Sequence, residues 1–407
     1  MWETKMNINQ VVEIRTRTLC YFGIGALQKV NDICDYLKDQ GISAVLVTTD
    51  EIVYKVTGVW EVLQPALESR GIKYALYTKV VPNPTVDGID EAAAMGKKIK
   101  AGAVIGIGGG SAIDTGKSAA VLLHPDYAQY NARDQYLFKF DSANAVPIIA
   151  INTTHGTGTE VDRFAVASIP ELNYKPALAV DSIYPTFAID DPAIMTKLPT
   201  GQTIYTAVDA LNHVVEAATS LVTSPYVVMM ATECARLVAK YLPQAVAHPD
   251  DLNARYYLLY ASMIGGIGFD NGLLHYTHAM EHPLSGLKPD LPHGLGLGMI
   301  LPAVIECIYP ACPEILASIF APYVPGLKGE AGEAQKCAAG VEQWLFNVGV
   351  TEKLADKGYT EKDVDTLTKL AFETPSLAGL LSMAPVKATE DKVRKIYMDS
   401  MKPMSSR

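Results

Sequence analysis

The chain has 407 residues, of which 49% are apolar and 19% charged, and its formal net charge is −10 at pH 7. A chain of this length exceeds what one simple core usually supports, so we expect a globular protein of two domains. The acidic balance makes nucleic acid and anionic membranes poor partners.

The cysteines and apolar runs predict the compartment. The six cysteines are scattered without CxxC spacing and the first residues do not have the pattern of a signal peptide, so we expect reduced thiols in the cytoplasm. The longest apolar run, residues 295–305, contains Pro302 and is too short to span a bilayer. We therefore expect no membrane segment.

Residues 1–194 alternate short β-rich runs with helical stretches. The predicted strands are apolar along nearly their whole length, which is typical of a parallel sheet covered by helices on both faces. We expect strands at 44–49, 74–78, 103–107 and 147–152, helices at 27–40 and 86–101, and further strands with turns within 172–191.

A glycine-rich turn follows the strand at 103–107, in the sequence AVIGIGGGSAIDTGKS. Glycines at a strand-to-helix turn let the backbone approach a diphosphate, and the helix N-terminus supplies free N–H groups. A tight turn with positive φ is the alternative. The spacing matches neither a P-loop nor the Rossmann fingerprint, so we expect a dinucleotide domain with a different strand order. The expected diphosphate-binding residues are Gly108, Gly109, Gly110 and Ser111.

Two further stretches of this half carry candidate cofactor contacts. Asp50 ends the first predicted strand, where an acid would bind a ribose 2′-OH and favour NAD over NADP, although a solvated strand-end aspartate is equally consistent. Residues 152–160 form a hydroxyl-rich loop after another strand. Thr153 and Thr154 could bind the nicotinamide end or could simply cap a turn, and His155 is either exposed or over the cofactor.

From residue 195 the chain is predicted to be all-helical. The expected helices are 204–220, 224–242, 252–269, 274–282, 314–321 and 331–348. We expect this helical domain, residues 195–407, to meet the α/β domain across a large fixed cleft, where ligands tend to bind.

The helical half also concentrates potential metal ligands. Asp209 and His213 lie four residues apart on a helical pattern, so their side chains share one face. Residues 271–294 then hold four of the chain's eight histidines, which are His275, His278, His282 and His293. His278 and His282 share a helix face ahead of Pro283, which is expected to begin to break the helix. His293 lies in a Pro-His-Gly sequence that is expected to form a turn.

A carboxylate with several imidazoles suits Fe(II), Zn(II), Mn(II) or Ni(II), whereas Ca and Mg prefer oxygen ligands. Histidines satisfied within a packed helical core are the alternative. Two spaced pairs and a Pro-His-Gly in a histidine-poor chain favour the metal site.

In combination these motifs resemble the iron-containing (group III) alcohol dehydrogenases, relatives of propanediol and lactaldehyde reductases. The resemblance extends nearly end to end and includes FGIG, VTTD, VPNPT, GGGSAIDTGK, TTHGTGTEV, VDALNHVVEA, HAMEHPL and PHG. It implies an N-terminal α/β dinucleotide domain and a C-terminal helical domain, with metal and substrate between them.

The resemblance also implies residue roles. The metal ligands would be Asp209, His213, His278 and His293, and His282 would lie beside the ion. We consider His282 a candidate for passing a proton to solvent, and a structural role in support of the ligands is the alternative. The implied cofactor contacts are Gly108, Gly109, Gly110 and Ser111 at the diphosphate, Asp50 at the ribose, Asn83 on the adenosine side, and Thr153, Thr154 and Lys175 near the nicotinamide.

The implied activity is hydride transfer between NAD(H) and a small alcohol or aldehyde at a divalent ion, with Fe(II) ahead of Zn(II) or Mn(II), in a homodimer or larger homo-oligomer. Two other classes stay open: an NAD-using carbon–oxygen lyase of the dehydroquinate synthase type, and a non-catalytic metal- or nucleotide-binding protein. The chain departs from the family at His155, where many members carry a small residue, and at Arg163-Phe164. Arg163 either attracts an anionic aldehyde or pairs with a nearby acid.

Overall fold

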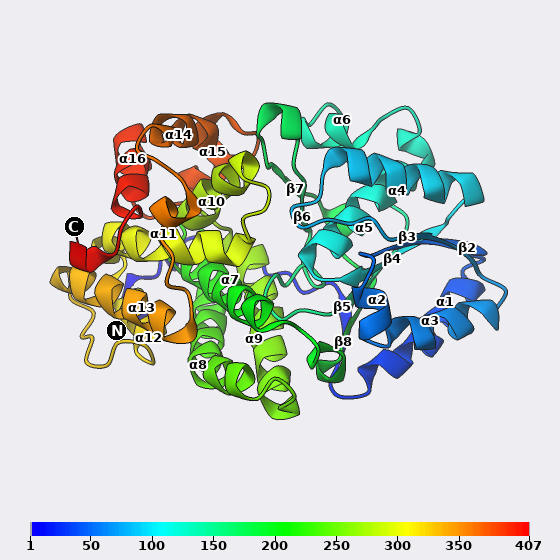
Figure 1. The fold of residues 1–407 in the computed structure, drawn as a ribbon, viewed down its shortest axis with the longest axis horizontal. Coiled ribbons are helices and arrows are strands. Elements are labelled where there is room, and N and C mark those ends of the chain that lie inside the picture. Colours follow the sequence, from blue (N-terminus) through cyan, green and yellow to red (C-terminus); the bar gives the residue numbers. More distant parts are fainter. Residues whose placement is uncertain (1, 407) are drawn as a thin grey trace.

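The computed structural model describes residues 2–406 and divides into a sheet-containing half and a helical half (Figure 1). The main sheet has six parallel strands in the order β1-β8-β5-β4-β2-β3, with consecutive partners in register along their lengths. Its strands are β1 (Leu19–Phe22), β2 (Ala44–Thr48), β3 (Lys73–Tyr77), β4 (Ala103–Gly108), β5 (Ile148–Asn152) and β8 (Phe187–Asp190). Two short antiparallel strands, β6 (Phe164–Val166) and β7 (Ala177–Ala179), form a separate ribbon.

Helices cover both faces of the main sheet because its strands are apolar on both sides. In β2, Val45 and Val47 join the core under one face and Leu46 joins the core under the other, as the period of two requires. The first face is covered by α1 (Val30–Asp39), α2 (Val53–Val56) and α3 (Val59–Glu68), and the second by α4 (Val86–Ile99), α5 (Gly110–Leu123) and α6 (Ala132–Tyr136). The predicted parallel sheet and its four individually predicted strands, β2 to β5, are confirmed, whereas the edge strand β1 and the helix α3 were not predicted from the sequence.

The helical half begins after the 3-10 turn Pro192–Met195 and builds its own core from residues 204–401. Its helices are α7 (Thr200–Thr219), α8 (Pro225–Ala247), α9 (Leu252–Gly272), α10 (Tyr276–Leu287), α11 (His293–Ile308), α12 (Pro313–Phe320), α13 (Ala334–Val348), α14 (Asp363–Glu373), α15 (Leu377–Ser382) and α16 (Glu390–Asp399). Caps fix several starts: Ser224 accepts from the Val227 N–H at α8, and Asp251 caps α9. The helical class is confirmed, although α11 and the last three helices were not predicted.

Two predictions about prolines and helix ends are wrong. Pro283 does not break α10, which continues to Leu287, because residues 276–286 are all buried and their packing outweighs the one lost hydrogen bond. His293 lies at the first position of α11 and not in a loop, since the Pro292 carbonyl accepts from the amides of Leu295 and Gly296 and starts the helix there.

Helix α11 is the one described segment long and apolar enough to cross a membrane by composition, over His293–Ala311. In this protein 78% of that window is buried, and α11 packs against α7, α10, α13 and α16 at the centre of the helical half. Its apolarity is therefore that of a core helix.

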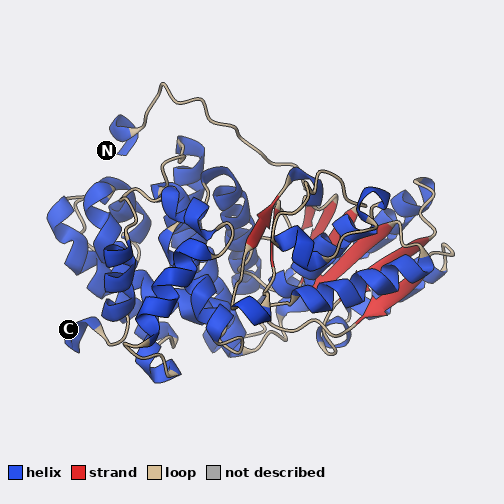
Figure 2. Ribbon diagram, turned by 90° about the horizontal axis from the view of Figure 1, so that it is seen from above, coloured by secondary structure: helices blue, strands red, loops and turns tan. Residues whose placement is uncertain are grey.

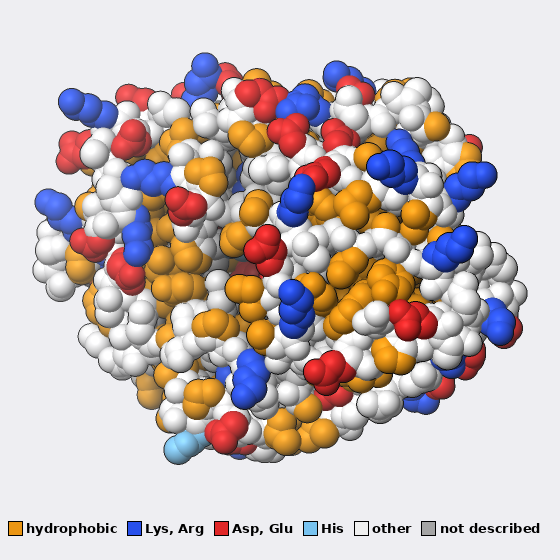
Figure 3. All heavy atoms as spheres, turned by 45° about the vertical axis from the view of Figure 1, so that its right-hand side comes forward, with side chains coloured by type: hydrophobic (Ala, Val, Ile, Leu, Met, Phe, Trp, Pro, Cys, Tyr) orange, Lys and Arg blue, Asp and Glu red, His pale blue; other side chains and the backbone are white. Residues whose placement is uncertain are grey.

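The surface and the N-terminal arm complete the description. On the face drawn in Figure 3, basic and acidic side chains are interspersed, which is unlike the basic stripe of nucleic-acid-binding proteins. The N-terminal segment runs as an extended arm over the helical half before it enters the sheet (Figure 2). The side chain of Asn271 holds the arm by donating to the Arg15 carbonyl (2.9 Å) and accepting from its amide (2.6 Å).

Candidate metal centre and dinucleotide site

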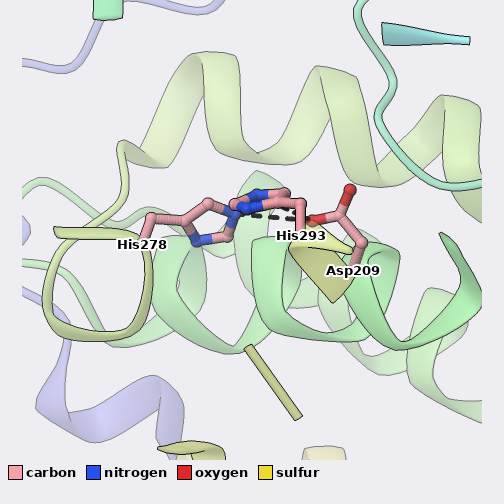
Figure 4. Close-up of side chains that lie close together, drawn as sticks. All are labelled: Asp209, His278 and His293. Atoms are coloured by element: carbon pink, nitrogen blue, oxygen red, sulfur yellow. Dashed lines mark ion pairs between the residues drawn. The ribbon is translucent and has the colours of Figure 1, made fainter. Parts of the chain in front are cut away.

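Three helices bring the predicted metal ligands together. Asp209 lies in α7, His278 in α10 and His293 at the start of α11, and one donor atom from each lies within 4.8 Å of the others. The Nε2 atoms of His278 and His293 point toward Asp209 Oδ1, at 3.5 and 3.8 Å (Figure 4). His213, one turn along α7 from Asp209, brings its Nε2 to 3.4 Å from the same oxygen. The four predicted ligands therefore converge on one centre.

A close contact between helices α7 and α11 makes this convergence possible. A Cβ on Gly294 would lie 1.9 Å from the carbonyl oxygen of Tyr205, so only glycine lets the start of α11 touch α7 here. Because Asp209 follows Tyr205 by one helical turn, this contact sets His293 beside it. The Pro-His-Gly sequence thus positions its histidine through the glycine as much as through the proline.

Two buried glutamates orient the imidazoles, and sequence reasoning missed both. Glu216 Oε2 is hydrogen-bonded to His278 Nδ1, and Glu281 Oε2 to His293 Nδ1. Both glutamates are fully buried. A carboxylate on Nδ1 keeps the proton there and leaves Nε2 as the ligand atom, which is the usual outer support of a metal-bound histidine. The available signal was spacing, because Glu216 lies seven residues after Asp209 on the same helix face.

The donor set fits a divalent transition ion. Asp209 Oδ1 and His278 Nε2 are buried and have no hydrogen-bond partner within residues 2–406. Such orphaned polar atoms are costly in a protein interior unless a bound group satisfies them. One carboxylate oxygen with imidazole nitrogens is the chemistry of Fe(II), Zn(II) or Mn(II) sites.

Burial and mutual charge shift the titration of these groups. Burial works against the ionisation of Glu216, but His278 outweighs it and lowers the pKa of Glu216 to about 2. Burial likewise opposes charge on His278, yet Glu216 and Asp209 raise the pKa of His278 to about 9. Burial lowers the pKa of His213 to about 4, against the opposing influence of Asp209. An ion entering the site must displace the proton from His278, so metal binding weakens as the pH falls.

The other two histidines of the cluster lie in different positions. His275 Nδ1 accepts from the Tyr276 amide (2.7 Å) and caps α10, and its Nε2 lies 2.9 Å from Thr219 Oγ1. His282 lies beside the centre, with its ring 5.6 Å from that of His293 and its Nδ1 bonded to the Lys175 carbonyl (2.8 Å). His275 is therefore occupied as a cap, whereas His282 borders the site.

Lys175 lies at the metal centre and not on the glycine loop. Its Nζ donates to Ser285 Oγ (2.9 Å) and forms a 3.4 Å ion pair with Glu281 Oε2. It also lies 3.5 Å from His293 Nδ1. This places the ammonium group next to the carboxylate that orients His293.

The glycine turn between β4 and α5 forms a cradle without side chains. A Cβ on Gly108, whose φ is +149°, would lie 2.7 Å from Ala112 Cβ. Cβ atoms on Gly109 and Gly110 would lie 2.8 and 2.9 Å from the side chains of Thr154 and Thr157, respectively. Helix α5 starts at Gly110 without a side-chain cap, so its first amides, including that of Ser111, are available to an anion. A diphosphate fits this cradle.

Other predicted cofactor contacts are partly engaged in local structure. Asp50 Oδ1 accepts from the Ile52 and Val53 amides (2.7 and 2.8 Å) at the start of α2, and Asn83 donates to the carbonyls of Pro289 and Leu291 (2.8 and 3.2 Å). The amide of Thr153 donates to the Gly108 carbonyl (3.0 Å), and the amide of Thr154 donates to Asn152 Oδ1 (3.0 Å). The second contact is a side-chain cap of the turn, which was the alternative interpretation of this loop. These contacts leave the second oxygen of the Asp50 carboxylate for a ligand.

Two residues where the chain departs from the family pattern have clear partners. Arg163 forms ion pairs with Asp181 (3.3 Å) and Asp270 (3.5 Å), so the interpretation as an acid-paired arginine is confirmed. His155 is fully buried against Arg255, so the expectation that it might be exposed is wrong.

The comparisons with known proteins agree with this geometry. Residues 18–192 match the family described as iron-containing alcohol dehydrogenase, and residues 203–401 match the C-terminal part of the Fe-containing alcohol dehydrogenase family. The chain belongs to the iron-containing alcohol dehydrogenase family. The membership confirms the resemblance seen in the sequence motifs, and the chain is an alcohol dehydrogenase.

Individual relatives cover the chain almost completely. It is 60% identical to long-chain primary alcohol dehydrogenase AdhA of Thermoanaerobacter ethanolicus over 98% of this chain and 100% of the relative. It is 31% identical to 1,3-propanediol dehydrogenase of Klebsiella pneumoniae over 93% of this chain and 95% of that protein. The structure of NADH-dependent butanol dehydrogenase A from Thermotoga maritima superimposes with a TM-score of 0.87 at 29% identity, over 97% of this chain and 99% of that one. The lyase and non-catalytic alternatives gain no support.

Proposed function

We propose that this iron-containing alcohol dehydrogenase interconverts primary alcohols and aldehydes with NAD(H), at one divalent ion held by Asp209, His213, His278 and His293. The observation that carries the proposal is the convergence of imidazole Nε2 atoms on the orphaned Oδ1 of Asp209. Fe(II) is the ion we expect in the cell, because the family is iron-containing, and Zn(II) or Mn(II) suit the same donors.

The dinucleotide is proposed to lie along the glycine turn, with Gly108, Gly109, Gly110 and Ser111 at the diphosphate. The absence of room for any Cβ in this turn and the uncapped start of α5 support that placement. Asp50 is proposed to accept a hydrogen bond from the adenosine ribose and to exclude NADPH. In agreement, the similar butanol dehydrogenase is described as NADH-dependent.

The remaining predicted contacts flank these two sites. Thr153 and Thr154 are proposed to lie along the nicotinamide half, because their loop packs on the glycine turn. Lys175 is proposed to act near the nicotinamide end from its place beside Glu281. Asn83 is proposed to border the adenosine side by holding the connection before α11 through its two carbonyl contacts.

When bound, the divalent ion supplies Lewis acidity that eases proton loss from the alcohol, and the nicotinamide ring accepts the hydride. The chain supplies placement, a dry site and a path for the proton. Among the ligands, His278 and Asp209 are at most 3% exposed and shield the inner side of the centre from bulk water, whereas the His293 side chain is 25% exposed. His282 donates Nδ1–H to the Lys175 carbonyl, which leaves Nε2 unprotonated, and we propose that this nitrogen accepts the proton released by the alcohol.

The substrate is proposed to be an uncharged primary alcohol, including long-chain ones. The ring of Phe269 packs on His213 at 4.4 Å between centroids, and Phe164 packs on Phe269 at 5.3 Å, so the flank of the centre is apolar. Arg163, the candidate for attracting an anionic aldehyde, is already paired with two aspartates. AdhA, the relative with 60% identity, is described as a long-chain primary alcohol dehydrogenase.

We also propose a two-domain organisation with domains 1–194 and 195–407, supported by hydrophobic cores that lie mainly on either side of the turn Pro192–Met195, with Leu259 of α9 packed into the core of the first half. A homodimer or larger homo-oligomer is supported by the exposed apolar side chains of the N-terminal arm, including Ile8 (91%) and Val11 (98%). A cytoplasmic location is supported by six cysteines that form no disulfide.

The test is anaerobic NADH absorbance with a series of aldehydes from acetaldehyde to decanal, after chelator treatment and after Fe(II) is restored. We expect turnover that requires the ion, favours NADH over NADPH, and is lost in His278→Ala. His248→Ala, at an exposed histidine after α8, is the matched control and should behave as the wild type. Full activity without metal, or in His278→Ala, would refute the proposal.

A further inference from the structure

The loop 153–159 connects the cofactor cradle with the metal centre. On one side, the side chains of Thr154 and Thr157 pack so closely on the glycine turn that Cβ atoms on Gly109 and Gly110 would lie only 2.8 and 2.9 Å from them, respectively. The loop therefore forms one wall of the glycine turn, and any displacement of it reshapes the surface that receives the dinucleotide.

The opposite side of the same loop lies against α7, which carries Asp209 and His213, and against the neighbouring helix α9. A Cβ on Gly156 would lie 2.3 Å from the Thr206 carbonyl oxygen in α7, and a Cβ on Gly158 would lie 2.4 Å from Gly266 Cα in α9. The loop therefore separates the two sites as a thin spacer, and its backbone packs directly against helices α7 and α9.

The side chain of His155 projects from the middle of this spacer into a buried hydrogen-bond network. Arg255 in α9 donates from Nη1 to His155 Nε2 (2.9 Å) and to Thr203 Oγ1 (2.8 Å). Because Nε2 of His155 accepts this hydrogen bond, the neutral ring carries its proton on Nδ1. Nδ1 lies 3.3 Å from Thr206 Oγ1, and the Thr206 hydroxyl donates to the Gln202 carbonyl (2.8 Å). The two ring nitrogens therefore fix the loop to α9 and α7 at once.

Arg255 is an unusual residue to find in this place. It is fully buried, its Nε donates to the Pro249 carbonyl (2.9 Å), and no carboxylate is ion-paired with it among residues 2–406. Its Nη2 has no hydrogen-bond partner in the same range. A buried charge with only neutral partners costs stability, and an apolar side chain of similar volume would pack more favourably. Stability alone therefore does not explain the guanidinium.

We propose that the Arg255–His155 pair is a positioning device that holds the loop 153–159 in place and so sets the distance between the nicotinamide cofactor and the metal centre. The inference rests on the proposed placement of the dinucleotide on the glycine turn. Neither residue touches the ligand atoms of the ion, so both act through the loop. Their effect should appear in cofactor binding and in turnover, and not in metal affinity.

Three single variants and one double variant separate the pair from the rest of the protein. Arg255→Met and His155→Leu each remove the hydrogen bond, whereas His155→Gln keeps an acceptor for the guanidinium. We expect the first two to raise the dissociation constant of NADH about tenfold, measured by fluorescence on metal-free protein, and to lower kcat about tenfold at saturating NADH. The double variant should lose no more than either single variant, because the residues act as a unit. His155→Gln should stay within about threefold of the wild type.

Metal affinity and thermal stability are read in the same samples. The dissociation constant of Zn(II) should change less than twofold, and the exposed Arg236→Met, which removes an ion pair with Glu233 in α8, should leave every quantity unchanged. Wild-type NADH binding and turnover in Arg255→Met and His155→Leu, with only the melting temperature lowered, would overturn the inference. If Arg255→Met does not fold, the comparison of His155→Leu with His155→Gln decides the question. A wild type that binds no NADH would refute the proposed function itself, and the inference with it.

Discussion

Replacing Glu216 by Gln tests whether the metal centre depends on the orientation of its imidazoles. Glu216 accepts the amides of His275 (3.2 Å) and Thr277 through Oε1 and binds His278 Nδ1 through Oε2. A glutamine can keep an oxygen at only one of these places. With its oxygen on the amides, its NH2 group faces His278 Nδ1, and a hydrogen bond then forms only if the imidazole moves its proton to Nε2, the atom needed for the ion.

The expected loss follows from that single bond. A hydrogen bond to a charged group contributes about 1.5–3 kcal/mol, and loss of such an outer carboxylate typically lowers metal affinity about 10- to 100-fold. We therefore expect the dissociation constants of Zn(II) and Fe(II) to rise by about 10- to 100-fold in Glu216→Gln. Activity at limiting metal should fall in proportion, and added ion should restore most of it.

The assay is competition for Zn(II) with a chromophoric chelator at pH 7.5, followed by anaerobic Fe(II) titration of activity. Glu233→Gln is the matched control, because Glu233 is a partly exposed glutamate whose partner is Arg236. Glu281→Gln should resemble Glu216→Gln, since it removes the same support from His293. If Glu216→Gln bound Zn(II) within twofold of the wild type, the assignment of Glu216 as an orienting carboxylate would be refuted.

Three further outcomes follow from the structure. In Gly109→Ala the new Cβ lies 2.8 Å from the Thr154 side chain, so we expect the dissociation constant of NADH, measured by fluorescence, to rise about tenfold (about 1.4 kcal/mol) with Zn(II) affinity unchanged; unaltered NADH binding would argue against the cradle. Asp50→Asn keeps an oxygen to cap α2 but removes the charge, so the ratio of kcat/KM for NADPH to that for NADH should rise about tenfold, and a ratio equal to the wild type's would remove Asp50 from cofactor selection. Burial, with Arg255 alongside, lowers the pKa of His155 from 6.5 to about 3, so the unfolded state binds this proton more readily than the folded state. The contribution of His155 to stability is therefore present above pH 6.5 and is lost at about 1.4 kcal/mol per pH unit as the pH falls toward 3. Urea unfolding should show a shallower pH dependence in His155→Gln over that range, and parallel curves for the two proteins would contradict the burial of a neutral imidazole.

The sequence by itself determined the features that depend on near neighbours in the chain. Apolar runs such as Ala44–Thr48 specify strands buried on both faces, and the four-residue spacing of Asp209 and His213 specifies two side chains on one helix face. The glycines of the turn after β4 indicate a cradle for an anion because no other residue leaves its amides so accessible. These inferences hold because periodicity and backbone conformation are local properties.

Only the tertiary structure decided which distant groups meet. Spacing places Glu216 on the helix face of Asp209, but it does not identify His278 as its partner. Nor does it predict that α10 continues through Pro283 or that Arg255 holds His155. Each of these depends on packing between segments far apart in the chain, where burial removes water and makes a partner obligatory for every polar group. The local sequence pattern therefore predicted the candidate ligands of the metal centre. The packing of α7, α10 and α11 determined which buried side chains support those ligands.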